Sequence, residues 1–157
     1  MSYDAIVIGG GLAGCSTALQ LVRRGHKVLL LEKATYPRHK LCGEFLSPET
    51  QASFRQLGVL DAVREAGARP ITRTQLTGPH GTSTEHALPG TALGLSRYQL
   101  DELLFHHACS AGADGRPGTR ATEVHGSFKD GFVVKAGSDA IEGRLVIGAY
   151  GRRGVLD

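Results

Sequence analysis

Residues 1–33 contain the pattern that most constrains how this chain can fold. Residues 5–8 form a short apolar run, and residues 9–14 form a glycine-rich segment. An uninterrupted apolar run is typical of a strand that is buried on both faces. A helical stretch to about Arg24 follows, and residues 28–31 repeat the buried-strand pattern before Glu32. The sequence therefore predicts an α/β, Rossmann-like fold that begins with a β-α-β unit and has a parallel sheet.

The first turn of this unit carries the motif G-x-G-x-x-G. Gly9 allows a tight turn out of the strand, Gly11 lets a pyrophosphate approach the backbone, and Gly14 lets the helix pack closely on the strand. Leu12 and Ala13 begin the helix, whose free N–H groups and positive dipole end attract phosphate. These five residues are predicted to bind a dinucleotide, the alternative being a glycine-rich turn without a ligand.

Glu32 ends the second predicted strand and is followed by Lys33. A carboxylate at this place accepts hydrogen bonds from an adenosine ribose and disfavours a 2′-phosphate there. The residues alone therefore leave two cofactors open, FAD and NAD, and Lys33 is included among the candidate cofactor contacts.

The middle of the chain changes from helical to extended patterns. The segment Ser47-Pro48-Glu49 predicts a helix start, and the helical region runs to about Ala66 with a break at Gly58. Residues 70–95 alternate in part and contain a Gly-Pro-His-Gly turn, which predicts an antiparallel β-hairpin. Strands are expected around residues 120–124, 132–135 and 144–147.

Ser96 and Gln99 form a capping box at the start of another helix, which Gly112 ends. Arg97 occupies the first turn of this helix, where a cation faces the positive end of the helix dipole. A nearby anion such as a pyrophosphate would offset that cost. A solvated arginine is the open alternative.

Charge and composition narrow the class of partner. The 157 residues include 18 Lys and Arg against 15 Asp and Glu, a formal net charge of +3 with both signs interleaved. This balance does not indicate nucleic acid as a partner. No apolar stretch is long enough for a transmembrane segment and the start lacks a basic leader, so neither a transmembrane helix nor a signal peptide is expected. Together with the three scattered cysteines, this makes a reducing cytoplasm the expected location.

The cysteines and histidines do not predict a metal site. The three cysteines lie far apart without a C-x-x-C pair, so neither a disulfide framework nor a zinc knuckle is expected. His106, His107 and Cys109 lie close together, but no fourth ligand of suitable spacing is nearby.

Four segments together point to a family: VIGGGLAGCSTALQLVRRGHKVLLLEK, KLCGEFLSPE, LSRYQLDELLFHHA and LVIGAYGRRGVLD. In this order they resemble the FAD-dependent oxidoreductases related to geranylgeranyl reductase, and more broadly the para-hydroxybenzoate hydroxylase superfamily. The resemblance covers the whole chain but only about the first two-fifths of such an enzyme.

The resemblance implies roles for individual residues. Gly9, Gly11 and Gly14 would hold the FAD pyrophosphate, Glu32 its adenosine ribose, and Arg97 the pyrophosphate. The loop from Lys40 would run along the cofactor with Cys42 and Gly43 towards the flavin, and the backbone at Val124 would border adenine. Whether Cys42 is a flavin-adjacent thiol or one without a redox role stays open. NADH or NADPH would be the reductant.

Two departures from the family pattern carry consequences. Tyr150 stands where relatives often have an acid, which puts the usual handling of the reductant in doubt. The second flavin motif and most of the substrate domain of such enzymes have no counterpart here. We therefore expect residues 1–157 to be the N-terminal part of an FAD-binding domain, a fragment or a truncated gene product. We also expect an uncovered sheet edge that allows self-association.

The functional expectation is an FAD-binding oxidoreductase module of a reductase or monooxygenase that acts on a hydrophobic or aromatic small molecule. No residue is a convincing acid, base or nucleophile, so no catalytic residue is named, and this chain alone is not assigned an activity. Two alternatives stay open: a non-catalytic nucleotide-binding or assembly fragment, and an NAD-dependent dehydrogenase.

Overall fold

A six-stranded sheet forms the centre of the computed structural model, which describes residues 2–151. The sheet has the strand order β6 (Asp114–Pro117), β2 (Val28–Glu32), β1 (Tyr3–Ile8), β9 (Asp139–Gly148), β8 (Gly131–Ala136) and β7 (Ala121–Ser127). The first four strands are parallel, and β8 and β7 continue the sheet in antiparallel pairing. This arrangement confirms the predicted Rossmann-like α/β fold.

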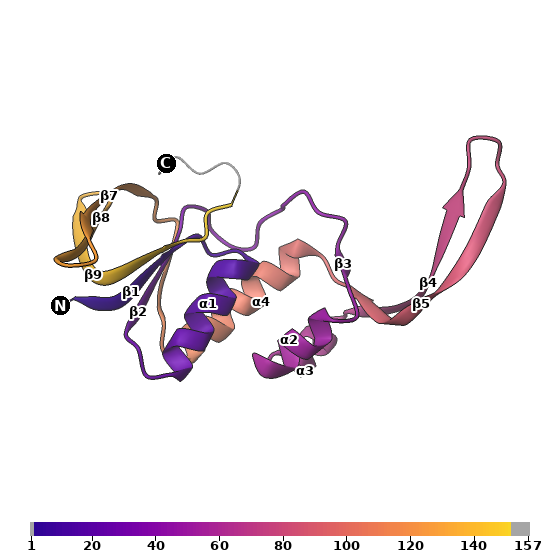
Figure 1. The fold of residues 1–157 in the computed structure, drawn as a ribbon, viewed down its shortest axis with the longest axis horizontal. Coiled ribbons are helices and arrows are strands. Elements are labelled where there is room, and N and C mark those ends of the chain that lie inside the picture. Colours follow the sequence, from indigo (N-terminus) through magenta and orange to yellow (C-terminus); the bar gives the residue numbers. More distant parts are fainter. Residues whose placement is uncertain (1, 152–157) are drawn as a thin grey trace.

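The strands of the β-α-β unit are buried on both faces because alternate residues belong to two apolar clusters. Val7 and Leu30 pack with the helices α1 (Leu12–Arg23) and α4 (Arg97–Ser110). Ile6 packs on the other face with residues of β8 and β9. Figure 1 shows α1 and α4 side by side over the sheet. The apolar runs of the sequence therefore correspond to strands with a cover on each face.

The helical region that the sequence predicts up to about Ala66 is divided, as expected, into α2 (Thr50–Gln56) and α3 (Leu60–Glu65). Gly58, which lies between them, has a φ of +58°, a conformation that favours glycine. The start differs from the expectation. The helix begins at Thr50, and Ser47 does not cap it; instead its hydroxyl bonds to the Thr50 hydroxyl at 3.2 Å and its carbonyl accepts the Thr50 N–H.

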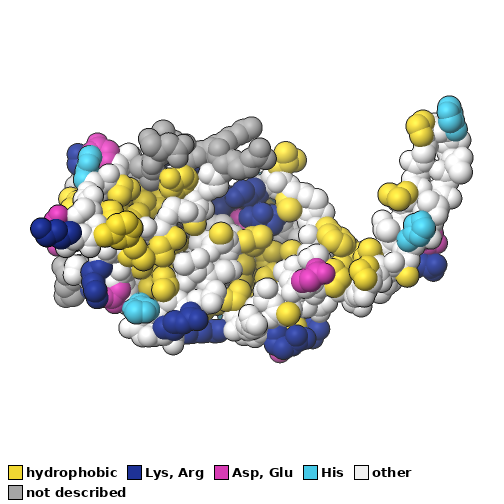
Figure 2. All heavy atoms as spheres, viewed as in Figure 1, with side chains coloured by type: hydrophobic (Ala, Val, Ile, Leu, Met, Phe, Trp, Pro, Cys, Tyr) yellow, Lys and Arg dark blue, Asp and Glu magenta, His cyan; other side chains and the backbone are white. Residues whose placement is uncertain are grey.

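A second, three-stranded sheet has the order β3 (Phe45–Leu46), β5 (Ser83–Gly94) and β4 (Arg69–Thr77). Strands β4 and β5 form the expected antiparallel hairpin, with a register shift between Ile71 and Arg73. In Figures 1 and 2 the hairpin projects away from the rest of the molecule as a narrow arm. Only its base is supported by a third strand, because β3 pairs with Leu93 and Gly94.

Two strands were not expected from the sequence, β3 and β6. The last strand, β9, is internal: it pairs with β1 on one side and β8 on the other. Its apolar residues 145–147 are exposed or half-buried in the structure. Within residues 2–151 the edges of the central sheet are therefore β6 and β7. None of the helices described is both long and apolar enough to span a bilayer.

Candidate nucleotide-binding site

The turn after β1 requires glycine at two of its predicted positions. Gly9 has a φ of +113°, and a Cβ there would lie 2.5 Å from the carbonyl oxygen of Ala149, just after β9. A Cβ at Gly14 would overlap the carbonyl oxygen of Gly9. Helix α1 therefore packs directly on the backbone of the turn, as the sequence predicts for a G-x-G-x-x-G motif.

The surroundings of Gly11 are different. A Cβ added there would meet only two atoms within 4 Å, Lys40 Nζ at 3.6 Å and Arg97 Nη2 at 3.8 Å. Both are the charged ends of flexible side chains, and the first N–H groups of α1 have no partner inside the helix. Room at the backbone, two cations and a helix N-terminus are the features that a pyrophosphate requires, so the residues present fit this group.

Glu32 lies directly beside the turn, although it follows the second strand of the unit. Its Oε2 accepts the N–H of Gly10 at 2.8 Å, and its Oε1 accepts the N–H of Ala34 at 2.9 Å. Arg38 donates a third hydrogen bond to Oε2 at 3.2 Å. The buried carboxylate is therefore fixed in orientation, and a carboxylate with three donors keeps acceptor capacity for a ribose hydroxyl.

Arg97 forms an ion pair with Asp101 of the same helix, α4. Its Nε and Nη2 bond the two carboxylate oxygens of Asp101 at 2.6 and 3.0 Å. Arg38 reaches the same carboxylate at 3.4 Å. Burial alone would lower the pKa of Arg97, but the hydrogen bonds and charge of Asp101 raise it above the usual value of arginine. The open alternative of a solvated Arg97 is therefore wrong for this structure.

Sequence reasoning gave no role to three residues of this site: Tyr36, Arg38 and Asp101. The hydroxyl of Tyr36 donates to the carbonyl of Gly10, opposite the N–H that Glu32 accepts. The spacing of Arg97 and Asp101, four residues apart on a helix, was a signal for their ion pair. Nothing in the sequence marks Tyr36 and Arg38, because a loop without periodicity brings them to the turn.

The other predicted contacts come from the loop after β2 and from β7, and one of them, Cys42, forms a side-chain hydrogen bond with Arg97. Lys33, Cys42 and Gly43 are exposed in the loop between β2 and β3, and Cys42 Sγ accepts the N–H of Glu44 at 3.4 Å. Val124 lies on β7 and packs against the cluster beneath β8 and β9. The segment after β6 contacts Glu32 instead: the N–H of Thr119 bonds the Glu32 carbonyl at 2.8 Å.

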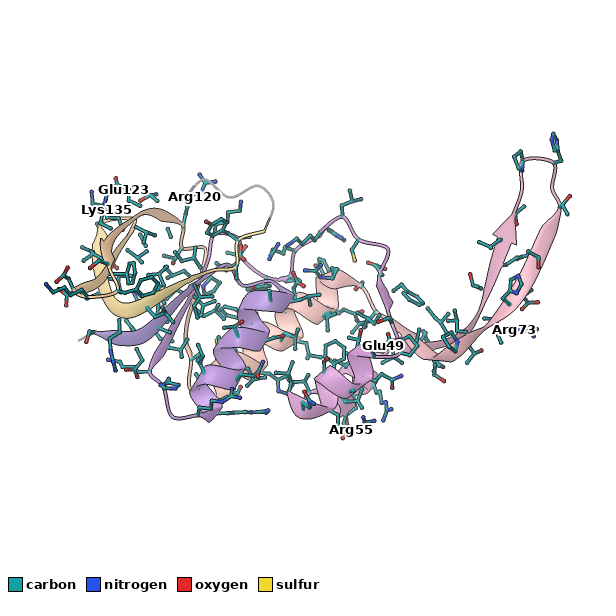
Figure 3. The ribbon with its side chains drawn as sticks, in the orientation of Figure 1. Glu49, Arg55, Arg73, Arg120, Glu123 and Lys135 are labelled. Atoms are coloured by element: carbon teal, nitrogen blue, oxygen red, sulfur yellow. The ribbon has the colours of Figure 1, made fainter. Side chains whose placement is uncertain are left out.

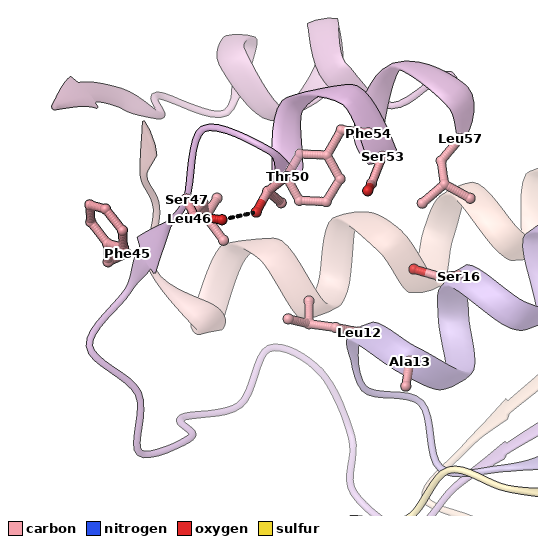
Figure 4. A pocket seen from close by; sticks show the side chains of 10 residues that line it. All are labelled: Leu12, Ala13, Ser16, Phe45, Leu46, Ser47, Thr50, Ser53, Phe54 and Leu57. Carbon is pink, nitrogen blue, oxygen red and sulfur yellow. Dashed lines mark hydrogen bonds between the residues drawn. The ribbon is translucent and has the colours of Figure 1, made fainter. Parts of the chain in front are cut away.

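An open pocket of about 450 Å³ lies on the other side of the first turn of α1. Figure 4 shows it between Leu12 and Ala13 of α1, Phe45 and Leu46 of β3, and Phe54 of α2. The Ser47–Thr50 hydrogen bond lies at its rim. The two helical residues predicted to bind the cofactor therefore also face an apolar pocket.

Near the turn, burial raises the pKa of two side chains, Cys15 and Tyr36. Burial, followed by the charges of Asp101, Cys109 and Glu32, raises the pKa of the Cys15 thiol to about 12. Burial also raises the pKa of Tyr36. In the part of the chain that the structure describes, no group of three or more potential ligands is placed to hold a metal ion.

Comparison with known proteins shows the family. The model of the family described as FAD binding domain matches residues 2–156. The chain therefore belongs to the FAD-binding domain family of flavin-dependent oxidoreductases, whose cofactor is FAD.

Relatives and solved structures agree with this assignment. The chain is 33% identical over 133 residues to a menaquinone reductase of Mycobacterium tuberculosis, covering 79% of this chain and 31% of that protein. It is 31% identical over 157 residues to an uncharacterised protein in the nifH2 5′ region of Methanosarcina barkeri, covering 96% of this chain and 83% of that protein. The myxobacterial chondrochloren halogenase CndH superposes with a TM-score of 0.87 at 27% identity, covering 99% of this chain and 38% of that chain.

The share of each relative's length that this chain covers differs widely. The chain spans about a third of the length of the menaquinone reductase and of the halogenase, but most of the length of the Methanosarcina protein. The family thus includes long enzymes and at least one short relative.

Proposed function

We propose that this chain binds the adenosine diphosphate half of FAD at the turn of residues 9–14, and that it forms the nucleotide-binding part of a larger flavin enzyme. In this assignment residues 1–157 are the N-terminal part of an FAD-binding domain, with the hairpin of residues 70–95 added to it. The observation that carries the proposal is the open backbone at Gly11, next to two cationic side-chain ends and the fixed carboxylate of Glu32.

Each predicted contact then has a task. Glu32 accepts a ribose hydroxyl, and Lys40 and Arg97 neutralise the two phosphates together with the N-terminus of α1. The remaining proposed contacts lie around this centre: Leu12, Ala13, Lys33, Cys42, Gly43 and Val124. FAD supplies the redox chemistry when it is bound, while the protein binds and orients it.

FAD titration tests the proposal directly. Flavin fluorescence and the flavin absorbance retained after gel filtration measure binding to the wild-type chain. Lys40→Ala and Arg97→Ala should each weaken FAD binding about tenfold, because a charge-assisted hydrogen bond is lost. Lys129→Ala, which removes an exposed cation between β7 and β8, is the control and should leave the affinity unchanged. A wild-type chain that takes up no FAD would contradict the proposal.

For the larger enzyme we propose a flavin-dependent reductase or monooxygenase related to geranylgeranyl reductase, acting on a hydrophobic or aromatic small molecule with NADH or NADPH as reductant. The K-L-C-G-E loop and the S-R-x-x-L-D helix start support this group. The test uses the full-length polypeptide, which is this chain together with any sequence encoded downstream of Asp157. Substrate reduction without oxygen identifies a reductase, and oxygen-dependent hydroxylation identifies a monooxygenase.

One observation favours the alternative of an assembly module. Along the arm, the outer edge of β4 has no third strand among the described residues, and eight of its nine residues are exposed. An uncovered edge pairs readily with another strand. We therefore propose self-association through β4 of two copies. Thr74→Lys with Leu76→Lys should abolish a concentration-dependent increase in mass in light scattering. A wild-type monomer at all concentrations would contradict this part.

The dehydrogenase alternative predicts a different ligand preference. NAD should then bind more tightly than FAD in the same titration, whereas our proposal expects FAD to bind more tightly. We also propose a cytoplasmic location, which the three free cysteines support, since a reducing compartment keeps thiols unpaired.

A further inference from the structure

Asp101 is a charged residue with no exposed surface, and the proposed cofactor contacts do not include it. A buried carboxylate is costly unless it is paired and hydrogen-bonded. Here two guanidinium groups satisfy it, Arg97 through two hydrogen bonds and Arg38 through a longer ion pair. The residue therefore has a defined geometry that a simple apolar helix position would not need.

The pair with Asp101 fixes which N–H groups of Arg97 stay available. A guanidinium has five N–H donors in a rigid plane. Asp101 takes the Nε donor and one donor of Nη2. Cys42 also forms a side-chain hydrogen bond with Arg97, so two of the five donors remain for a ligand. The same Nη2 lies 3.8 Å from the position of a Cβ on Gly11. Asp101 thus holds the Arg97 guanidinium beside the open backbone of the turn.

The charge of Asp101 also balances the site. Arg97, Arg38 and Lys40 are three cations near the turn, and Glu32 alone would leave them largely uncompensated. Ion pairs of alternating sign run from Glu32 through Arg38 to Asp101 and on to Arg97. Of the two arginines, Arg38 is held less tightly, since its buried Nε has no hydrogen-bond partner among residues 2–151.

We propose that Asp101 is a positioning residue for cofactor binding: it orients Arg97 towards the phosphates of the nucleotide without touching the nucleotide itself. The inference rests on the proposed function, because it assigns the phosphates to the turn at Gly11. It extends that function to a residue of α4 that reaches the cofactor only through its neighbour.

A purely structural role for Asp101 gives a different expectation. If Asp101 only stabilised the fold, its loss would weaken all ligands alike, with or without Arg97. If it positions Arg97, its loss should affect ligands with phosphate groups and only when Arg97 is present. ADP and adenosine share the nucleoside and differ in the phosphates, so they separate the two roles.

A double-mutant cycle of Asp101→Asn, Arg97→Ala and the double variant tests this, with ADP and adenosine binding measured by calorimetry. Asparagine keeps the size of the side chain, but it removes the charge and puts an NH2 group in place of one carboxylate oxygen, so one of the two guanidinium donors faces N–H donors instead of an acceptor. We expect Asp101→Asn to weaken ADP about tenfold, the lower end of what loss of an orienting partner costs at metal sites. It should leave adenosine binding unchanged and add nothing in the Arg97→Ala background.

Arg97→Lys provides a second variant that leaves the buried carboxylate in place, in case Asp101→Asn does not fold. Lysine keeps the charge but cannot make a planar two-point pair. It should therefore weaken ADP severalfold and leave adenosine unchanged. Equal weakening of ADP and adenosine, or an Arg97→Lys chain that binds ADP as the wild type does, would overturn the inference.

The same titrations separate this inference from the proposed function. A wild-type chain that binds neither ADP nor FAD contradicts the proposed function, and the inference with it. A wild-type chain that binds ADP, together with a folded Asp101→Asn variant of unchanged ADP affinity, contradicts the inference alone.

Discussion

The glycine turn and the hairpin arm are built in opposite ways. At the turn, backbone atoms of three segments lie in direct contact: the end of β1, the start of α1 and Ala149 after β9. Along the arm, β4 has one partly buried residue, Ile71, and its other residues are exposed. The turn is held by segments from both ends of the sequence, whereas among residues 2–151 the outer arm is held mainly by the pairing of β4 with β5.

This difference indicates which part is preformed. At the turn, Glu32 accepts the N–H of Gly10 and Tyr36 donates to its carbonyl, so contacts within the protein fix both polar groups of Gly10. An isolated two-stranded ribbon is marginally stable in water, so the outer arm needs a third strand or another surface to gain comparable rigidity. The proposed nucleotide site therefore has a fixed shape, whereas the outer arm exposes backbone and side chains that another strand could cover.

The largest expected effect is at the turn. Gly14→Ala places a Cβ on the carbonyl oxygen of Gly9, so the backbone of the turn or of α1 would have to shift. We expect a loss of about 4 kcal/mol or more in the free energy of unfolding, or no folded protein at all. Gly43→Ala is the matched control, because a Cβ there meets nothing within 4 Å. Thermal melts of both variants should differ widely, and equal melting temperatures would contradict the close packing of the turn.

A matched pair of leucines compares the two regions directly. Leu104 in α4 is 1% exposed, and Leu76 near the tip of the arm is 62% exposed. Leu104→Ala should lower the free energy of unfolding by about 2–5 kcal/mol. Leu76→Ala should change it by less than about 0.5 kcal/mol. Urea titrations measure both values. A large effect of Leu76→Ala would mean that the arm packs on something already present in the protein.

The third prediction concerns the free energy of unfolding at alkaline pH. The effect is absent at neutral pH. Burial raises the pKa of Cys15 from 9.0 to about 12, and burial also raises the pKa values of Tyr36 and Cys109. The unfolded chain loses these protons first, so the free energy of unfolding should fall as the pH rises from about 9 to 12. Cys15→Ala should make this decrease shallower. An equal slope in both proteins would show that Cys15 does not contribute.

Much of the turn could be predicted from sequence because its determinants are local. The glycine spacing, the apolar runs and Glu32 each reflect a requirement of one short segment, and the structure places all of them as expected. The capping residue Ser96 is another such case, since its hydroxyl accepts the N–H of Gln99 at 3.3 Å.

What the sequence did not predict depends on contacts between distant segments. Strand β6 reads Asp-Gly-Arg-Pro, without an apolar pattern, and becomes a strand because β2 offers an unpaired edge. Arg38 and Tyr36 come from an aperiodic loop, so only the fold shows that they reach Asp101 and Gly10. The start of α2 was misplaced because Ser47 bonds to Thr50 sideways instead of capping the helix.

The smallest expected effect is an ion pair on the arm. Arg73 and Glu85 face each other across β4 and β5, with Nε and Oε1 at 2.7 Å, and both side chains are at least half exposed. Figure 3 shows Arg73 on the arm, far from the labelled Glu123 and Lys135 on β7 and β8.

An exposed pair of this kind is worth about 0.5 kcal/mol or less, because water and salt screen it. Arg73→Ala, Glu85→Ala and the double variant should therefore show almost no coupling in urea titrations of a monomeric sample. The distance alone would suggest the opposite, since it is nearly the same as that between Arg97 and Asp101. If coupling appears only at protein concentrations where the mass increases, the pair is being buried by a second copy of β4. The coupling energy between Arg73 and Glu85 would then measure the association of the arm directly.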